Sequence, residues 1–115
     1  GSKLRTVGSI YPQYSTARDV LKRNSDADIY KFKDVIYANM TDVEWMQEDF
    51  QRYSKGEEVG EIRKQSTKAF MFSNFTATKL PKGTKIYSNV DINTTGFLMV
   101  EYDGEIFYYG ALIEG

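Results

Sequence analysis

The chain has no cysteine and no histidine among its 115 residues. Without cysteine it cannot form disulfides, thiolate metal sites, iron–sulfur clusters or a cysteine nucleophile. Without histidine it lacks the usual general base of enzymes and the commonest zinc ligand. We therefore expect a binding role rather than catalysis, with no cofactor and no metal site.

An excess of charge of one sign and long apolar runs are also missing. Lys and Arg number 15 and Asp and Glu number 16, so the formal net charge is −1. A chain this balanced has no overall field that would attract nucleic acid, and we expect no nucleic-acid partner. No apolar run approaches the ~18 residues that a membrane-spanning helix needs.

The length of the chain fits a single domain. Gly1-Ser2 is typical of the scar that tag removal leaves, and residues that break regular structure interrupt the stretch that follows. We expect residues 1–14 to be this scar followed by a linker or lead-in strand. Residues 15–115 are expected to form one domain.

Two short helices are expected, each opened by a capping box. Thr16, with Asp19 three residues later, predicts a helix over about 17–24. Thr41, followed three residues later by a glutamate, predicts a second helix over about 42–53. Apolar residues repeat at helical spacing along the second segment, which indicates one buried face.

The rest of the pattern is that of a mostly antiparallel sheet. β-branched and aromatic residues flank Lys33-Asp34 and predict a hairpin, although these residues rarely form its turn. Asp103-Gly104 is a stronger hairpin signal, because both central positions of such a turn need positive φ. The charged stretch 58–65 predicts an edge strand, and segment 66–76 fits either a loop or a strand. The fold expected is α+β, with the two short helices packed on about five to seven strands.

Catalysis without histidine or cysteine would depend on carboxylates, and acidic residues cluster at several points. The candidates are Asp26/Asp28, Asp42/Glu44, Glu48/Asp49 and Glu57/Glu58/Glu61. None lies in an apolar run, and the number of acids is ordinary for a soluble domain. The loop 91–96 resembles the start of a calcium loop, but Tyr102 stands where its twelfth position needs glutamate. A carboxylate-dependent cell-wall or glycan hydrolase is therefore the alternative to a binding role.

Aromatic residues are the feature most able to carry a function. They make up 15% of the chain, and several crowd the hairpin at Asp103-Gly104. Tyrosine combines a large contact area with a polar tip, which suits protein interfaces and the stacking of sugar rings. The alternative is that these side chains form the core of a small sheet. The predicted binding residues are Tyr87, Tyr102, Phe107, Tyr108 and Tyr109.

Several short phrases of the sequence resemble a group of small predicted lipoproteins of the Bacillus type. They are Asp26–Ile29, Val35–Asn39, Asp42–Trp45, Gly56-Glu57, Val59–Ile62, Ala77–Tyr87 and Tyr109–Gly115, and the resemblance covers about residues 20–115. It implies a mature domain held outside the cytoplasmic membrane of a Gram-positive bacterium by a lipidated cysteine that would precede this sequence. Contact with the membrane would then be through that anchor only. This group has no established activity, so the resemblance assigns no functional residues.

A second resemblance concerns the phrase Leu80–Tyr87, which precedes the clearest hairpin. It is similar to the opening of bacterial SH3-like barrels and would place such a barrel in the C-terminal half. Residues and resemblances together predict a non-enzymatic extracytoplasmic lipoprotein domain. We expect it to bind a protein partner or a cell-wall component through tyrosine-rich surface.

Overall fold

The computed structural model describes residues 13–41, 55–89 and 96–114. These residues form ten strands, one α-helix and one 3-10 turn. The helical elements are α2 (Ala17–Arg23) and η2 (Ala69–Met71). The strands are β1 (Gln13–Tyr14), β2 (Ile29–Phe32), β3 (Val35–Asn39), β4 (Lys55–Glu61), β5 (Lys64–Gln65), β6 (Thr76–Ala77), β7 (Lys85–Asn89), β8 (Phe97–Tyr102), β9 (Glu105–Ala111) and β10 (Ile113–Glu114).

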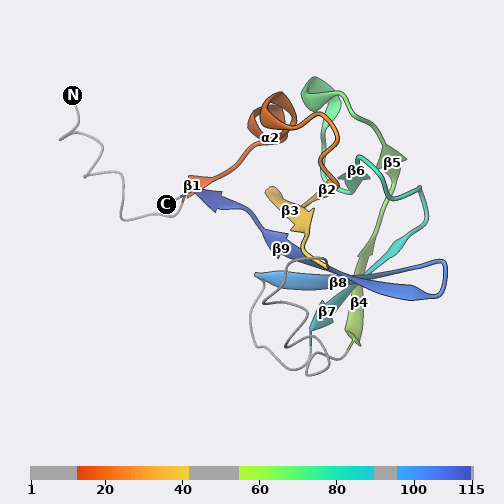
Figure 1. Cartoon of the computed structure of the whole chain (residues 1–115). Helices are drawn as coiled ribbons and strands as arrows, with labels where there is room; N and C mark the ends of the chain where they lie inside the picture. The colour runs from red at the N-terminus through yellow and green to blue at the C-terminus, as the bar shows by residue number, and fades with distance from the viewer. Residues whose placement is uncertain (1–12, 42–54, 90–95, 115) are drawn as a thin grey trace.

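Eight of these strands form one curled sheet (Figure 1). Its order is β4-β7-β8-β9-β3-β2-β6-β5, and every neighbouring pair is antiparallel except β5 and β6. The two outermost strands are consecutive in the chain, since only Ile62 and Arg63 separate β4 from β5. Segment 55–65 therefore bends from one end of the sheet to the other, and the sheet curls into half a barrel. A separate pair joins β1 to β10.

Both predicted hairpins are confirmed, and each turns through two residues with positive φ. Asp103 and Gly104, with φ of 54° and 79°, join β8 to β9. Lys33 and Asp34, with φ of 50° and 67°, join β2 to β3 although neither is a glycine. The side chain of Asn74 accepts from the Asp34 N–H at 2.8 Å and donates to its carboxylate at 3.2 Å. A distant residue thus supports a turn whose own residues are poorly suited to it.

The first predicted helix is confirmed as α2. The Thr16 hydroxyl accepts a hydrogen bond from the Asp19 N–H at 3.1 Å, as the capping box predicts. Ala17 is buried in a small cluster with Phe72, so the helix covers part of the sheet through its first turn. The second predicted helix, over 42–53, lies outside the described residues.

Thr16→Ala should lower the free energy of unfolding by about 1 kcal/mol, because the Asp19 N–H loses its side-chain acceptor. Urea unfolding followed by circular dichroism measures this change. Thr16→Ser is the matched control, since it keeps the accepting oxygen and should stay close to the wild type. An alanine variant as stable as the wild type would contradict the capping role.

The predicted mostly antiparallel sheet is confirmed, but the balance of helix and strand differs from the α+β fold expected. The described residues are mostly β, with one short helix and a 3-10 turn. The expected five to seven strands were too few for the sheet, which has eight. β5 and β6 account for the difference, because strands of two residues carry no detectable period-two pattern. The sequence fits either a loop or a strand over segment 66–76. In the structure this segment contains η2 and the first residue of β6.

Side chains are packed on both faces of the sheet, and the larger cluster lies on one of them. It contains Tyr30, Phe32, Tyr37, Ile62, Ala77, Leu80, Ile86, Leu98, Val100 and Tyr109. Met99 and Tyr108 form a smaller cluster on the opposite face. Adjacent residues such as Met99 and Val100 are therefore both buried, because successive side chains of a strand point to opposite faces.

Candidate functional site

The five predicted binding residues do not form one surface. Phe107 and Tyr109 pack with the larger cluster, whereas Tyr87 and Tyr108 pack with the smaller cluster on the opposite face. Tyr109 and Tyr108 are buried, with exposed fractions of 0% and 8%, while Tyr102 is 44% exposed. Alternation along β9 causes this division, because Tyr108 lies between two residues that face the other way.

Three of the five nevertheless border one pocket of about 150 Å³, which we call the Tyr109 pocket. Its lining residues are Asp28, Asn39, Lys79, Leu80, Tyr102, Phe107 and Tyr109. Leu80 and Phe107 provide apolar walls, and the ring of Tyr102 stands at the exposed side. The volume is below the ~300–1,000 Å³ typical of pockets for drug-sized ligands. It can take one ring-sized group of a larger molecule.

The polar end of the Tyr109 pocket is a row of three residues. Asp28 immediately precedes β2 and lies beside Asn39 at the end of β3, whose N–H donates to the Asp28 carbonyl at 2.9 Å. Asn39 in turn pairs with Tyr109 of β9. Residues directly opposite one another on neighbouring strands share a face of the sheet. The register of the sheet therefore brings the three side chains together.

Hydrogen bonds fix the Asp28 carboxylate within this row. The Tyr109 hydroxyl donates to its Oδ1 at 2.9 Å, and the Asn39 amide donates to its Oδ2 at 2.8 Å. A carboxylate has about four acceptor positions, so Asp28 can still accept from a ligand. Burial, reinforced by the negative charge of Asp28, raises the pKa of Tyr109 well above its usual value. At neutral pH Tyr109 therefore acts as a hydrogen-bond donor.

Stacked tyrosine rings adjoin the row and hold Tyr109 in place. The ring centroids of Tyr30 and Tyr37 lie 5.5 Å apart with the planes 12° from parallel. Those of Tyr30 and Tyr109 lie 4.8 Å apart at 50°. Tyr30 is fully buried, and within the described residues its hydroxyl has no hydrogen-bond partner. The ring packing stabilises the cluster, whereas the Tyr30 hydroxyl carries an uncompensated cost of burial.

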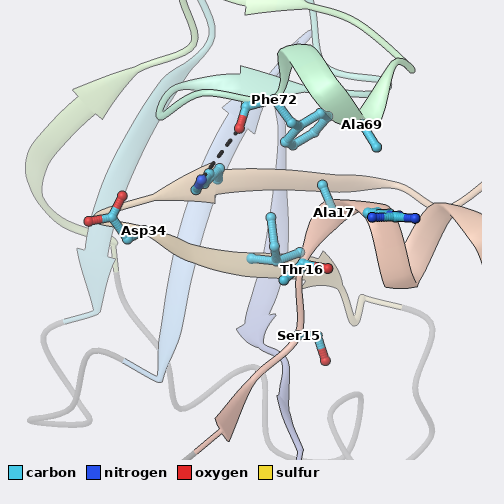
Figure 2. A pocket seen from close by; sticks show the side chains of 9 residues that line it. Ser15, Thr16, Ala17, Asp34, Ala69 and Phe72 are labelled. Carbon is cyan, nitrogen blue, oxygen red and sulfur yellow. Dashed lines mark hydrogen bonds between the residues drawn. The ribbon is translucent and has the colours of Figure 1, made fainter.

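A second pocket, of about 190 Å³, lies between α2, the β2–β3 hairpin and η2 (Figure 2). We call it the α2–η2 pocket. It is lined by Ser15, Thr16, Ala17, Arg18, Lys31, Asp34, Ile36, Ala69 and Phe72. It shares no lining residue with the Tyr109 pocket and contains none of the predicted aromatic binding residues.

Each of these two pockets has one carboxylate in its lining, Asp28 and Asp34 respectively. Glycoside hydrolysis requires two carboxyl groups about 5–9.5 Å apart around the substrate. Two of the predicted acidic candidates, Glu58 and Glu61, are paired with Lys85 at 3.5 and 2.6 Å. The candidates on the predicted second helix lie outside the described residues. No observation within the described ranges favours the hydrolase alternative.

A cluster of metal-ligating side chains and a membrane-spanning helix are both absent from the part of the chain that the structure describes. There, no group of three or more His, Cys, Asp or Glu side chains could hold a metal ion. No helix there is long and apolar enough to cross a membrane. Most of the calcium-like loop 91–96 lies outside the described residues.

Sequence reasoning missed part of the Tyr109 pocket. Asn39, Lys79 and Leu80 were not expected at a site, and Asp28 was considered only as one of an acidic pair. Asp28 and Asn39 could have been placed together from the sequence, because a hairpin centred on Lys33-Asp34 sets them opposite one another. No local signal shows that β9 lies beside β3 or that Leu80 closes the pocket.

Comparison of the chain with protein-family models, with curated proteins and with solved structures gave no match. The geometry of the Tyr109 pocket is therefore the basis for assigning a function.

Proposed function

We propose that the protein is a non-enzymatic binding domain that holds one ring-sized unit of a cell-wall glycan in the Tyr109 pocket. The observation that carries the proposal is that aromatic side chains and a carboxylate held by two hydrogen bonds line the same pocket. Tyr102 and Phe107 line the same pocket as the Asp28 carboxylate, which Tyr109 and Asn39 orient. An apolar wall beside a few fixed polar groups is the usual composition of a small-ligand site.

The chemistry of a sugar ring matches these two parts of the pocket. One face of a pyranose is lined by C–H groups and stacks on an aromatic ring such as Tyr102, which is 44% exposed. The hydroxyls around its edge are hydrogen-bond donors and acceptors. Asp28 can accept from them, and the exposed Lys79 at the same pocket can donate.

The small size of the pocket suits a unit within a polymer. One ring buried in about 150 Å³ gives limited affinity on its own. A repeating glycan offers many equivalent units, and a domain held near it rebinds at high effective concentration. The other occupant that fits the volume is a side chain of a protein partner, which the test below separates from a glycan.

The proposal includes an extracytoplasmic position held by a lipid anchor, which the resemblance to small predicted lipoproteins supports. Such a position would bring the pocket within reach of the cell wall. The finer fold that goes with it is an SH3-like barrel in the C-terminal half. The curl of the sheet and the passage of the phrase Leu80–Tyr87 into β7 support that assignment.

Co-sedimentation with purified, insoluble peptidoglycan tests the proposed function. The wild type should sediment with it, and Tyr102→Ser should weaken binding about fivefold to tenfold, because a stacking ring is lost. Val59→Ser is the matched control, since Val59 is also apolar and exposed (39%) but lies on β4, away from the pocket lining.

Two results would contradict the proposal. A wild-type chain that stays in solution would exclude the glycan, and a protein side chain would become the occupant to seek. A Tyr102→Ser variant that sediments as strongly as Val59→Ser would show that any glycan binding occurs elsewhere.

A further inference from the structure

The 3-10 turn η2 presents two adjacent apolar side chains to solvent. Phe70 is 84% exposed, the highest value for a large hydrophobic residue in the described ranges, and Met71 is 46% exposed. Burying a phenylalanine stabilises a folded domain by about 1.5–3 kcal/mol, and the fold forgoes this at Phe70. Single exposed apolar residues are common, but two neighbours at the tip of one turn form a small continuous patch.

This tip is held firmly by the residues beneath it. Phe72 is buried against Ala17, with an exposed fraction of 6%. The Lys64 ammonium donates to the Met71 carbonyl at 2.7 Å. The Lys31 ammonium donates to the Phe72 carbonyl at 3.4 Å, shown by the dashed line in Figure 2. The outward direction of Phe70 and Met71 is therefore imposed by contacts on the inner side of the turn.

Four cations lie at or near this turn. Lys68 immediately precedes η2, and Lys64 contacts it. Arg18 and Lys31 line the α2–η2 pocket together with residues of the turn. The single carboxylate lining that pocket, Asp34, is hydrogen-bonded to Asn74. From residue 62 to 90 the sequence has no Asp or Glu.

These cations are not used in ion pairs within the described residues. The ion pairs found there involve Lys55 and Lys85, which bind glutamates of β4 and β8. In Figure 1, β4 and β7 lie at the bottom of the molecule, whereas η2 lies at the top beside α2. Near the apolar tip, the charges of Arg18 and Lys68 are therefore not neutralised by an ion pair within the described residues.

We propose that this tip docks on a bilayer rich in anionic phospholipid. Phe70 and Met71 enter the interfacial region, Arg18 and Lys68 face the lipid phosphates, and Lys31 and Lys64 add positive charge beneath the tip, where they hold the Phe72 and Met71 carbonyls. Interfacial binding combines inserted apolar side chains with attraction between cations and a negative surface, and both parts are present here. The cationic surroundings favour this occupant over an apolar groove on a protein. The proposal adds direct membrane contact to the function proposed above and does not depend on the Tyr109 pocket.

Vesicle co-sedimentation of the 115-residue chain tests this inference. The wild type should bind vesicles of equimolar phosphatidylglycerol and phosphatidylcholine at low salt, and should not bind pure phosphatidylcholine. Raising NaCl to about 0.5 M should weaken binding, because the screening length shortens to a few ångströms. Phe70→Ser should lower the partition coefficient about tenfold or more. The double variant Arg18→Gln/Lys68→Gln should lower it by a similar factor.

Val59→Ser is again the control, because it removes an exposed apolar side chain from a strand rich in glutamate and should bind like the wild type. Phe70→Ser should keep the melting temperature, since its side chain is almost fully exposed, and circular dichroism verifies this. The proposal is overturned if the wild type does not bind anionic vesicles or binds neutral vesicles equally well. It is also overturned if Phe70→Ser binds as strongly as Val59→Ser.

Discussion

Tyr109→Phe should lower the free energy of unfolding by about 2 kcal/mol, whereas Tyr30→Phe should raise it by about 1 kcal/mol. The two rings are in contact, with centroids 4.8 Å apart, and both side chains are fully buried. The Tyr109 hydroxyl donates to the Asp28 carboxylate, and a hydrogen bond to a charged group contributes about 1.5–3 kcal/mol. The Tyr30 hydroxyl has no partner within the described residues, so its removal relieves a burial cost.

Chemical unfolding of both single variants and of the double variant measures these effects. Each substitution removes one oxygen and keeps the ring, so the packing of the cluster is preserved. The double variant shows whether the two hydroxyls interact, because residues in contact often depart from additivity. If Tyr30→Phe destabilised the protein as much as Tyr109→Phe, the Tyr30 hydroxyl would have a hydrogen-bond partner and no uncompensated cost of burial.

Stability should also fall steeply above pH 10. Burial raises the pKa of both Tyr30 and Tyr109 well above the usual value of 10.0. Above pH 10 the unfolded chain loses these phenolic protons while the folded chain keeps them, so the free energy of unfolding decreases as pH rises. Each tyrosine contributes about 1.4 kcal/mol per pH unit, and the two together roughly 3 kcal/mol per unit. Below pH 10 this contribution to stability is fully present.

Urea unfolding from neutral pH to about pH 12 tests the alkaline prediction. Tyr109→Phe should reduce the slope above pH 10 by about 1.4 kcal/mol per pH unit, because the folded chain then retains one phenolic proton fewer. Val59→Ser is the control, since it replaces an exposed side chain that carries no ionisable group, and it should leave the slope unchanged. Equal slopes for the wild type and Tyr109→Phe would show that Tyr109 ionises as easily in the folded chain as in the unfolded one.

The parts of the fold that neighbouring residues determine could be predicted from the sequence. Thr16 caps α2, and Asp103-Gly104 turns the β8–β9 hairpin, because each signal lies within a few residues of the structure it produces. Lys33-Asp34 was a poorer turn signal, since its support comes from Asn74, about forty residues away. The number of strands was underestimated for a similar reason. β5 and β6 are each two residues long and are defined by their pairing with other strands, not by a local pattern.

The candidate site was predictable to a smaller extent. Alternation along β9 places the side chain of Tyr108 on the opposite face from those of its two neighbours. The prediction of one aromatic surface did not take this alternation into account. Hairpin register places Asp28 opposite Asn39, but the pairing of Asn39 with Tyr109 joins strands seventy residues apart. Leu80 reaches the pocket from the bend between β6 and β7. Such contacts depend on how the sheet curls, and no residue pattern near Leu80 indicates that this side chain lines the pocket.

The glycan site in the Tyr109 pocket is tested most directly by an amide chemical-shift titration of the isotope-labelled chain with soluble peptidoglycan glycan fragments. Saturable shifts are expected only for residues around the Tyr109 pocket, such as Asn39, Leu80 and Phe107. Tyr102→Ser should reduce them, and Val59→Ser should leave them intact. No saturable shift, or shifts that lie elsewhere and persist in Tyr102→Ser, would contradict a glycan site in this pocket.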